Sequence, residues 1–375
     1  MKRKDRGAVA TGAARTIGRG VAAVLGAFAF VVAIGVPAAG DWLPKPSLHW
    51  TQTPTVDKHA MLNDVAVHEG VGWAVGVDVD EERPLILRWA DGRWTETPQP
   101  VSSNAVLESV AIAGPDDVWA VGENRADPSS SKPLVLHWDG RRWRTVAGPQ
   151  VPAGSFGEVA IGPDGAVWAG GWANVEGTEH AVVYRYVDGT WQPLTAGLEQ
   201  SINANALAIL AEDDAWVGLN AGLAHYDGTR WELVDEVPSD GSHIPTALAV
   251  AGPKDIWVVG VEHSSSGELP LALHYDGVSW TRVSVAGWSG QLYDVALRGG
   301  RPLAVGERFM RMGDVVVAKP LVLEYNGSVF VGAPRPTETE GTLTAVDVSG
   351  DRVWSAGLVI SDSGDFVPFV AYATS

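Results

Sequence analysis

The chain has 375 residues, a net charge of −18 and no cysteine. The lack of cysteine excludes disulfides, thiol catalysis and cysteine-ligated zinc. Residues 1–40 contain six basic side chains against one aspartate, so the rest of the chain carries a net charge of −23. Such a surface repels phosphate backbones, and we expect no nucleic-acid partner.

The first 40 residues have the order of a secretory signal. A basic start precedes residues 21–36, which are sixteen residues without a charge, and residues 37–40 (PAAG) suit a signal peptidase. The alternative is a retained anchor over residues 17–36 with its basic side in the cytoplasm. Both interpretations place residues 41–375 outside the cytoplasmic membrane, secreted or tethered only through this segment.

Seven copies of one pattern fill the remaining chain. In the clearest copy, residues 110–112 (VAI) lead to DVWAVG at 117–122, LVLHWDG at 134–140 and Trp143. Such a copy spans about 40 to 50 residues and holds four strand-like segments, which is typical of a β-propeller blade. The sequence therefore predicts an all-β, seven-bladed propeller of four-stranded antiparallel blades.

The four strands of each copy can be placed in order. Strand one is a short apolar run such as residues 65–67, and strand two carries a Trp in six copies and Leu303 in the other. Strand three is a Leu-x-Leu-x-aromatic run, and strand four begins at a second aromatic five residues later. A two-residue turn places the two aromatics directly opposite each other, so we expect structural cross-strand pairs. These pairs are Trp89 and Trp94, Trp138 and Trp143, Tyr186 and Trp191, Tyr226 and Trp231, Tyr275 and Trp280, and Tyr325 and Phe330.

The two ends of the chain are expected to share one blade. The last copy stops after its third strand, near residues 369–372, whereas residues 49–54 (HWTQTP) match residues 93–98 (RWTETP) of the first copy. Residues 47–56 would supply the missing outer strand and close the ring. Residues 41–375 are therefore expected to form a single propeller domain.

Three aromatic-Asp dipeptides carry a family resemblance. Trp138-Asp139, Tyr226-Asp227 and Tyr275-Asp276 end strand three, as the WD dipeptide does in WD40 repeats. Over residues 47–375 the chain resembles secreted bacterial propellers built on DVWAVG and LVLHWDG repeats, which are WD40-like and kelch-like in plan. The Gly-His of WD40 repeats is absent, and the Gly-Gly doublet of kelch repeats does not recur from copy to copy. This resemblance implies the propeller fold, but it assigns no functional residue in this chain.

Some conspicuous side chains recur by blade and are therefore expected to be structural. His137, His225 and His274 occupy one position of the repeat, too far from the axis to converge on a metal. The Asp residues before strand two are expected to form turns.

The candidate ligand site lies where strand one meets the channel mouth. Asp64, Glu158 and Asp294 break a small-residue pattern there, with Glu108 beside it. A cation such as calcium, or an amine-bearing ligand, would suit these carboxylates. The competing interpretation is that neighbouring backbone amides hold them. No other cofactor is predicted.

The loops between strands two and three are the candidate partner surface, because they differ most between copies and are acidic. The first copy contributes Asp78, Asp80, Glu81 and Glu82, and the sixth contributes a basic and apolar loop with Arg308, Phe309 and Arg311. Loops carry binding sites more often than the rigid blades that hold them.

No nucleophile elbow, phosphate loop or metal-spaced cluster marks an enzyme. We therefore expect a monomeric, non-enzymatic scaffold outside the cytoplasm that recognises a protein or an envelope glycan through its acidic loop face. The alternative is a glycan-active hydrolase or lyase that uses Asp64, Glu158 or Asp294 as acid and base.

Overall fold

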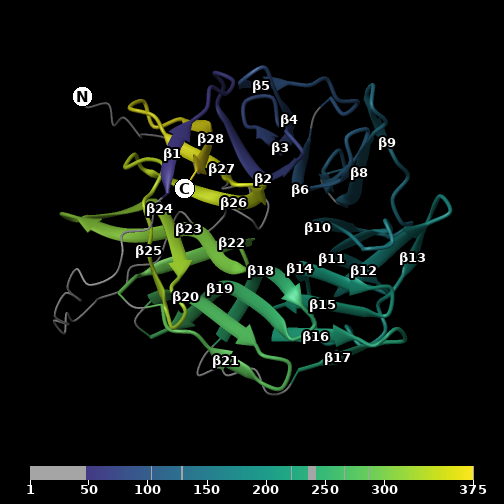
Figure 1. Ribbon diagram of the computed structural model, residues 1–375. Coiled ribbons are helices and arrows are strands. Elements are labelled where there is room, and N and C mark those ends of the chain that lie inside the picture. Colours follow the sequence, from purple (N-terminus) through teal and green to yellow (C-terminus); the bar gives the residue numbers. More distant parts are fainter. Residues whose placement is uncertain are drawn as a thin grey trace, which may run out of the picture.

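The computed structural model describes residues 48–374 except 103, 128–129, 221, 235–241, 266 and 286. The signal or anchor segment predicted within residues 1–40 lies outside these described residues. Strands β1 to β28 form seven four-stranded antiparallel sheets arranged in a ring (Figure 1), and the described residues contain no helix. The predicted seven-bladed propeller is confirmed. Accordingly, no helix of the described part is long and apolar enough to cross a membrane.

In the first four blades, the strands run from the channel outward in chain order. Blade 1 has β2 (Ala60–His68), β3 (Val71–Asp78), β4 (Arg83–Ala90) and β5 (Arg93–Glu96). Blade 2 has β6 (Ala105–Gly114), β7 (Asp117–Asn124), β8 (Lys132–Trp138) and β9 (Trp143–Thr145). Blade 3 has β10 (Gly154–Ile161), β11 (Val167–Val175), β12 (Thr178–Val187) and β13 (Thr190–Pro193). Blade 4 has β14 (Ala204–Ala211), β15 (Asp214–Leu219), β16 (Gly222–Tyr226) and β17 (Trp231–Leu233).

The last three blades follow the same plan, and the seventh takes its outer strand from the other end of the chain. Blade 5 has β18 (Ser242–Gly252), β19 (Asp255–Ser264), β20 (Gly267–Tyr275) and β21 (Trp280–Arg282). Blade 6 has β22 (Gly290–Arg298), β23 (Arg301–Met312), β24 (Val315–Tyr325) and β25 (Phe330–Gly332). Blade 7 has β26 (Gly341–Ser349), β27 (Arg352–Ile360), β28 (Phe366–Thr374) and β1 (His49–Gln52).

The repeated aromatics join neighbouring blades. Trp138 and Trp143 are directly opposite in β8 and β9, as predicted. Trp73, from strand two of the preceding blade, packs against both, with ring centroids 4.9 Å from Trp138 and 5.0 Å from Trp143. Trp73 is fully buried. Each such contact adds aromatic packing to the burial of apolar area, so the repeat specifies the blade interfaces.

The N-terminal strand closes the ring, as predicted. In β1, Trp50 lies opposite Ala373 of β28, and its indole Nε1 donates a 2.7 Å hydrogen bond to the Pro334 carbonyl of blade 6. In Figure 1 the purple β1 lies beside the yellow β28. The ends of the described chain therefore share one sheet.

The inner strands begin earlier than the sequence pattern indicated. The pattern placed strand one of the first blade at residues 65–67, but β2 starts at Ala60 and contains a bulge between Leu62 and Asp64. The same bulge occurs in all seven blades. A bulge inserts one residue into the two-residue alternation, so the sequence period is lost there. The inserted residues are Asn63, Glu108, Gly157, Asn205, Thr246, Tyr293 and Thr344.

The glycine that ends DVWAVG accommodates this bulge. A Cβ on Gly122 would lie 2.1 Å from the Val106 carbonyl oxygen, and one on Gly76 would lie 2.0 Å from that of Met61. Glycine permits this close approach of two backbones in six blades, whereas blade 4 forms the same bulge with Leu219 at this position. The motif therefore accommodates the bulge that lines the channel in those six blades.

The repeated histidines are structural in this geometry, as expected. His137 stacks on Trp119 with ring centroids 4.3 Å apart, and its Nε2 lies 2.8 Å from the Asp117 carboxylate. His225 and His274 make the same contacts in blades 4 and 5.

Candidate functional site

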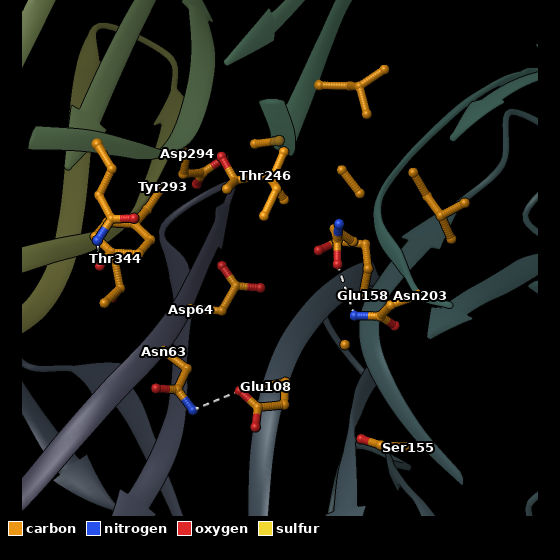
Figure 2. A pocket seen from close by; sticks show the side chains of 18 of the residues that line it. Asn63, Asp64, Glu108, Ser155, Glu158, Asn203, Thr246, Tyr293, Asp294 and Thr344 are labelled. Atoms are coloured by element: carbon orange, nitrogen blue, oxygen red, sulfur yellow. Dashed lines mark hydrogen bonds between the residues drawn. The ribbon is translucent and has the colours of Figure 1, made fainter. Parts of the chain in front are cut away.

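All seven blades line one cavity of about 830 Å³ in the central channel. The four carboxylates predicted at the channel mouth, Asp64, Glu108, Glu158 and Asp294, all lie on its wall (Figure 2). The lining continues to residues such as Glu179 and Glu268, near the turns between strands two and three. The structure therefore brings the predicted residues together and connects them to the acidic loop face.

Asp64 bonds the inner strands of blades 1 and 2 together. Its Oδ1 accepts a 2.7 Å hydrogen bond from the Val65 amide, and its Oδ2 accepts bonds from the Val110 amide at 2.8 Å and the Ser109 hydroxyl at 3.0 Å. An inner strand is a sheet edge, so its amides need partners from outside the sheet. Asp64 supplies such partners in two blades.

Asp294 repeats this arrangement between blades 6 and 7, and Asp347 repeats it between blades 7 and 1. Asp294 accepts 2.7 Å bonds from its following amide and from Val346 of blade 7. Asp347 accepts bonds from Val348 at 2.7 Å and from Val67 of blade 1 at 2.6 Å. The competing interpretation from the sequence, carboxylates held by backbone amides, thus describes Asp64 and Asp294.

Neutral side chains join further junctions. The bulge residues Asn63, Thr246 and Thr344 donate to carbonyls of the next blade at 2.8, 2.9 and 2.8 Å respectively. The Ser109 hydroxyl accepts a 3.3 Å bond from the Val159 amide of blade 3. We call these side-chain contacts, with those of Asp64, Asp294 and Asp347, the inner-ring hydrogen bonds.

Among the described residues, the junctions between blades 3 and 4 and between blades 4 and 5 lack inner-ring hydrogen bonds. The bulge residues there are Gly157 and Asn205, and each is followed by a residue, Glu158 or Ala206, that bonds no neighbouring strand. Glu158 has the repeat position of Asp64, yet no described group donates a hydrogen bond to its carboxyl. Among the described residues, these two junctions therefore lack the inner-ring hydrogen bonds that the other five junctions make.

The same sector contains buried amide atoms without a described partner, on residues that line the cavity. Asn203 and Asn205 both line it, and Nδ2 of Asn203 donates to Oδ1 of Asn205 at 2.7 Å. Oδ1 of Asn203 and Nδ2 of Asn205 have no hydrogen-bond partner in the described part of the chain. Unpaired buried polar atoms are costly, so they point to a ligand or ordered water.

Trp172 is the aromatic wall of this sector. It belongs to β11 and lines the cavity. It occupies neither of the two positions at which the repeat places a Trp. Its partner in β10 is Ser155, which also lines the cavity. The indole is only partly buried, so one part of its surface is open to a ligand.

Burial in the channel raises the pKa of Asp64, Glu108, Glu158 and Asp294. Burial brings the pKa of Asp64 to about 6, that of Glu108 to about 7 and, with the charge of Asp64, that of Asp294 to about 8. Burial also raises the pKa of Glu158 well above its usual range, and the charges of Asp64 and Asp294 add to this. The unfavourable step in each case is ionisation away from water.

Few cations compensate these groups. Arg125 is the cavity's guanidinium, and its Nε donates a 2.7 Å bond to Glu123 beside it. No lysine is part of the cavity lining. In the described residues, no three His, Asp or Glu side chains are grouped closely enough to hold a metal ion.

Tyr293 joins the cavity to a buried carboxyl. Its hydroxyl donates a 3.1 Å hydrogen bond to Glu307, which is 0% exposed. Gln291 at 2.7 Å and Thr342 at 2.5 Å also donate to Glu307. These three donors satisfy the buried side chain and fix the position of the Tyr293 ring on the cavity wall.

The acidic turn of blade 1 lies outside the cavity lining. Asp78 is 3% exposed and pairs with Lys58 at 2.9 Å, so it has a structural role. Asp80 and Glu81 are exposed and contact His59 and Arg83 respectively, and Glu82 is exposed with a φ of 48°. Of the four, the last three remain candidate partner residues.

The predicted loop of blade 6 is a β-ribbon instead. Residues 308–312 belong to β23, which pairs with β24 as far as Met312 and Val315, beyond the start of β22 (Figure 1). Arg308 lies over the Trp288 ring at 5.4 Å, Phe309 is partly buried, and Arg311 is exposed. Alternating apolar residues, including exposed Met312 and Val316, favour a strand over a loop.

Sequence reasoning missed Trp172, Asn203, Asn205 and Asp347. Two signals were available. Asp347 stands where the other six blades have alanine, and Trp172 is a Trp outside the repeat positions. The asparagines lie before or at the bulge, where the repeat alignment had no strand.

The comparisons with known proteins support the fold. No protein-family model matches the chain, so none supports the WD40-like or kelch-like assignment, and no curated protein matches it in sequence. A polysaccharide lyase matches in structure at 11% identity and a TM-score of 0.51, covering 84% of this chain and 89% of its own. A xyloglucanase from Xanthomonas campestris matches at 14% identity and a TM-score of 0.55, covering 85% of this chain and 55% of its own. A puromycin-hydrolysing peptidase from Mycobacterium tuberculosis matches at 16% identity and a TM-score of 0.53, covering 88% of this chain and 54% of its own. At these identities the likeness shows the propeller fold alone.

Proposed function

We propose that this protein is a non-enzymatic binding propeller that works outside the cytoplasmic membrane and takes a short stretch of glycan into its central cavity. The observation that carries the proposal is the sector of blades 3 and 4. There Trp172, Glu158 and the unpaired amide atoms of Asn203 and Asn205 share one cavity wall, and the inner-ring hydrogen bonds are missing.

These residue types suit a sugar. A pyranose has an apolar C–H face, which packs on an aromatic ring, and a rim of hydroxyls, which pair with amides and carboxylates. The cavity volume of about 830 Å³ is within the range of well-formed ligand pockets. The acidic wall disfavours sulfated or uronic glycans, so the proposed ligand is neutral or cationic.

Two of the structural neighbours are, by name, a polysaccharide lyase and a xyloglucanase. The propeller fold is therefore compatible with polysaccharide sites. The residues of this cavity, and not those names, support a glycan ligand here.

The exposed elements of the same face would contact whatever carries the glycan. Asp80, Glu81 and Glu82 of blade 1 and the ribbon of blade 6 around Arg311 are placed to meet an envelope protein or the continuing polymer. Met312 and Val316 are 53% and 64% exposed, and with exposed Met310 and Val315 they gather apolar side chains on one ribbon, as partner-binding surfaces do.

A glycan array with the secreted protein, followed by calorimetry with the best ligand, tests the proposal. Trp172→Ala should weaken binding about 10-fold, whereas Trp172→Phe, which keeps an aromatic face, should retain most of it. A ligand that binds the Trp172→Ala and Trp172→Phe variants with the same affinity does not contact the Trp172 ring. That result contradicts the proposal. So does an array on which no glycan binds.

Catalysis is a second candidate because two carboxyls suit acid–base chemistry. Burial places the pKa of Glu108 at about 7, and the same cause raises the pKa of Glu158. A group that titrates near the working pH can donate and accept a proton efficiently. Asp64 is a poor base because three donors already occupy its oxygens.

Turnover by the wild-type protein on a polysaccharide panel would establish this second function. Glu108→Gln and Glu158→Gln should then each reduce turnover at least about 100-fold. Binding without turnover on the ligand found by the array supports the scaffold function instead.

A further inference from the structure

We infer that the glycan carries a free ammonium group, and that this group binds in the channel among the carboxyls of Glu158, Asp64 and Asp294. The ligand class is thus an amino sugar with an unsubstituted amine. The inference rests on the proposed function, because it assigns a chemical class to the ligand of the same cavity.

Glu158 is the anchor of this site. Its repeat position in blades 1 and 6 holds Asp64 and Asp294, whose oxygens are bound by strand amides. The Glu158 carboxyl has no such donors, and the two aspartates are the charged groups that act on it. All three residues line the same cavity, and of the three only Glu158 has no described group that donates to its carboxyl oxygens.

No cation of the described chain occupies that space. The guanidinium of Arg125 is engaged by Glu123, and the nearest approach of His263 to an acid is 3.7 Å, to Glu268 at the rim. Ionising several carboxyls in one cavity is unfavourable unless a cation joins them. An ammonium group from the ligand provides that charge, and a phosphate or uronate would not.

The neighbouring groups complete the coordination of an amine. An ammonium has three N–H donors and needs three acceptors. Besides Glu158, the wall offers the unpaired Oδ1 of Asn203 and the face of Trp172, which attracts cations. The sugar ring and its amine would thus use the same sector of blades 3 and 4.

Binding should release a proton. Burial and like charges raise the pKa of Glu158 in the free protein, which favours its protonated form. When the ammonium arrives, the carboxylate form is stabilised, so the carboxyl loses its proton to solvent while the amine keeps its own. No covalent bond other than this O–H changes.

A matched ligand pair tests the inference on the whole protein. A β-linked N-acetylglucosamine tetrasaccharide and its fully deacetylated form differ only in the acetyl groups. Calorimetry at pH 5.5, where the sugar amines are already protonated, in two buffers of different ionisation enthalpy gives affinity and proton release together. We expect the deacetylated form to bind about 10-fold or more tightly, with an enthalpy that depends on the buffer.

Variants locate the effect. Glu158→Gln keeps the side-chain shape and should bring the two affinities together and abolish the buffer dependence. Glu69→Gln, on an exposed turn of the opposite face, removes a charge outside the cavity and should leave both unchanged. Thermal unfolding checks that each variant folds, and the comparison of the two ligands on the wild-type protein needs no variant.

Failure of this inference differs from failure of the proposed function. Equal affinity for both ligands, or a preference for the acetylated one, overturns the ammonium assignment while glycan binding stands. Tighter binding of the amine without proton release overturns the role of Glu158. If the array also finds no glycan at all, both conclusions fail.

Discussion

Replacing Asp347 by alanine should weaken the junction that closes the ring. The other six blades have alanine at this position: Ala66, Ala111, Ala160, Ala208, Ala249 and Ala296. Alanine therefore fits the site, and the change removes only the two bonds to Val348 and Val67, at 2.7 and 2.6 Å. Bonds to a charged acceptor contribute about 1.5–3 kcal/mol each. Channel water can replace part of this, so we expect a net loss of about 1–3 kcal/mol in the free energy of unfolding.

The loss should depend on pH in a defined direction. Burial raises the pKa of Asp347 above the usual value of an aspartate. A group whose pKa is raised by folding stabilises the fold most below its unfolded pKa, and this contribution disappears as pH rises through the folded pKa. The difference between wild type and variant should therefore be larger at pH 5 than at pH 8.

Urea unfolding followed by tryptophan fluorescence at these two pH values measures both effects. Asp347→Asn is the matched control, because its amide keeps one acceptor and should lose about half as much stability. A difference below about 0.5 kcal/mol at pH 5, or a larger difference at pH 8, would refute the role given to the inner-ring hydrogen bonds.

Three further outcomes follow from the same structure. The thermal midpoint of the wild-type protein should be higher at pH 5 than at pH 8 in a fluorimetric melt. Burial raises the pKa of Glu108 to about 7 and that of Asp294 to about 8, so their ionisation destabilises the fold. A midpoint that rises with pH contradicts this. Truncation that removes β1 (His49–Gln52) should expose the edge of β28 and cause aggregation or a lower midpoint, measured by light scattering and melting, and an unchanged melt would refute ring closure by this strand. Lys58→Met should cost about 1–3 kcal/mol in urea unfolding, because Asp78, 3% exposed, loses its 2.9 Å ion pair; no loss would mean that Arg83 alone satisfies it.

The fold could be predicted from the sequence because each blade repeats the same local rules. The spacing of pairs such as Trp138 and Trp143 is enough to predict the outer hairpin. The similarity of residues 49–54 to residues 93–98 predicts the strand that the last copy lacks. Each copy of the repeat predicts the same four strands, so one irregular copy does not change the predicted fold. Local and global preferences agree throughout the scaffold.

The site could be predicted only in part. The position of Asp64, Glu158 and Asp294 on the channel follows from the repeat and is correct, but their roles differ for reasons that no single strand reveals. Whether a carboxylate bonds the next blade depends on the length of its side chain and on the bulge before it. The side chain of Glu158 is one methylene longer than that of an aspartate. Its carboxyl accepts no hydrogen bond from the strand amides, whereas the carboxyls of Asp64 and Asp294 do.

The bulge also hid Asn205 and its neighbours. Period-two alternation fails where one residue is inserted, so a search by hydrophobic pattern finds the strand only after the insertion. The residues that line the channel are thus the ones that the pattern describes least well.

The pairing of β1 with β28 has a consequence for the order of synthesis. The strand that is made first among those described must wait for the strand that is made last, about 320 residues later by their register. Six blades can assemble while the chain emerges, but the seventh stays a three-stranded sheet with an open edge until both ends are present. Closing so long a loop is slow compared with forming any hairpin within a blade. The unfinished ring is therefore the stage at which this protein is most exposed to wrong pairing, and its completion is a single late event.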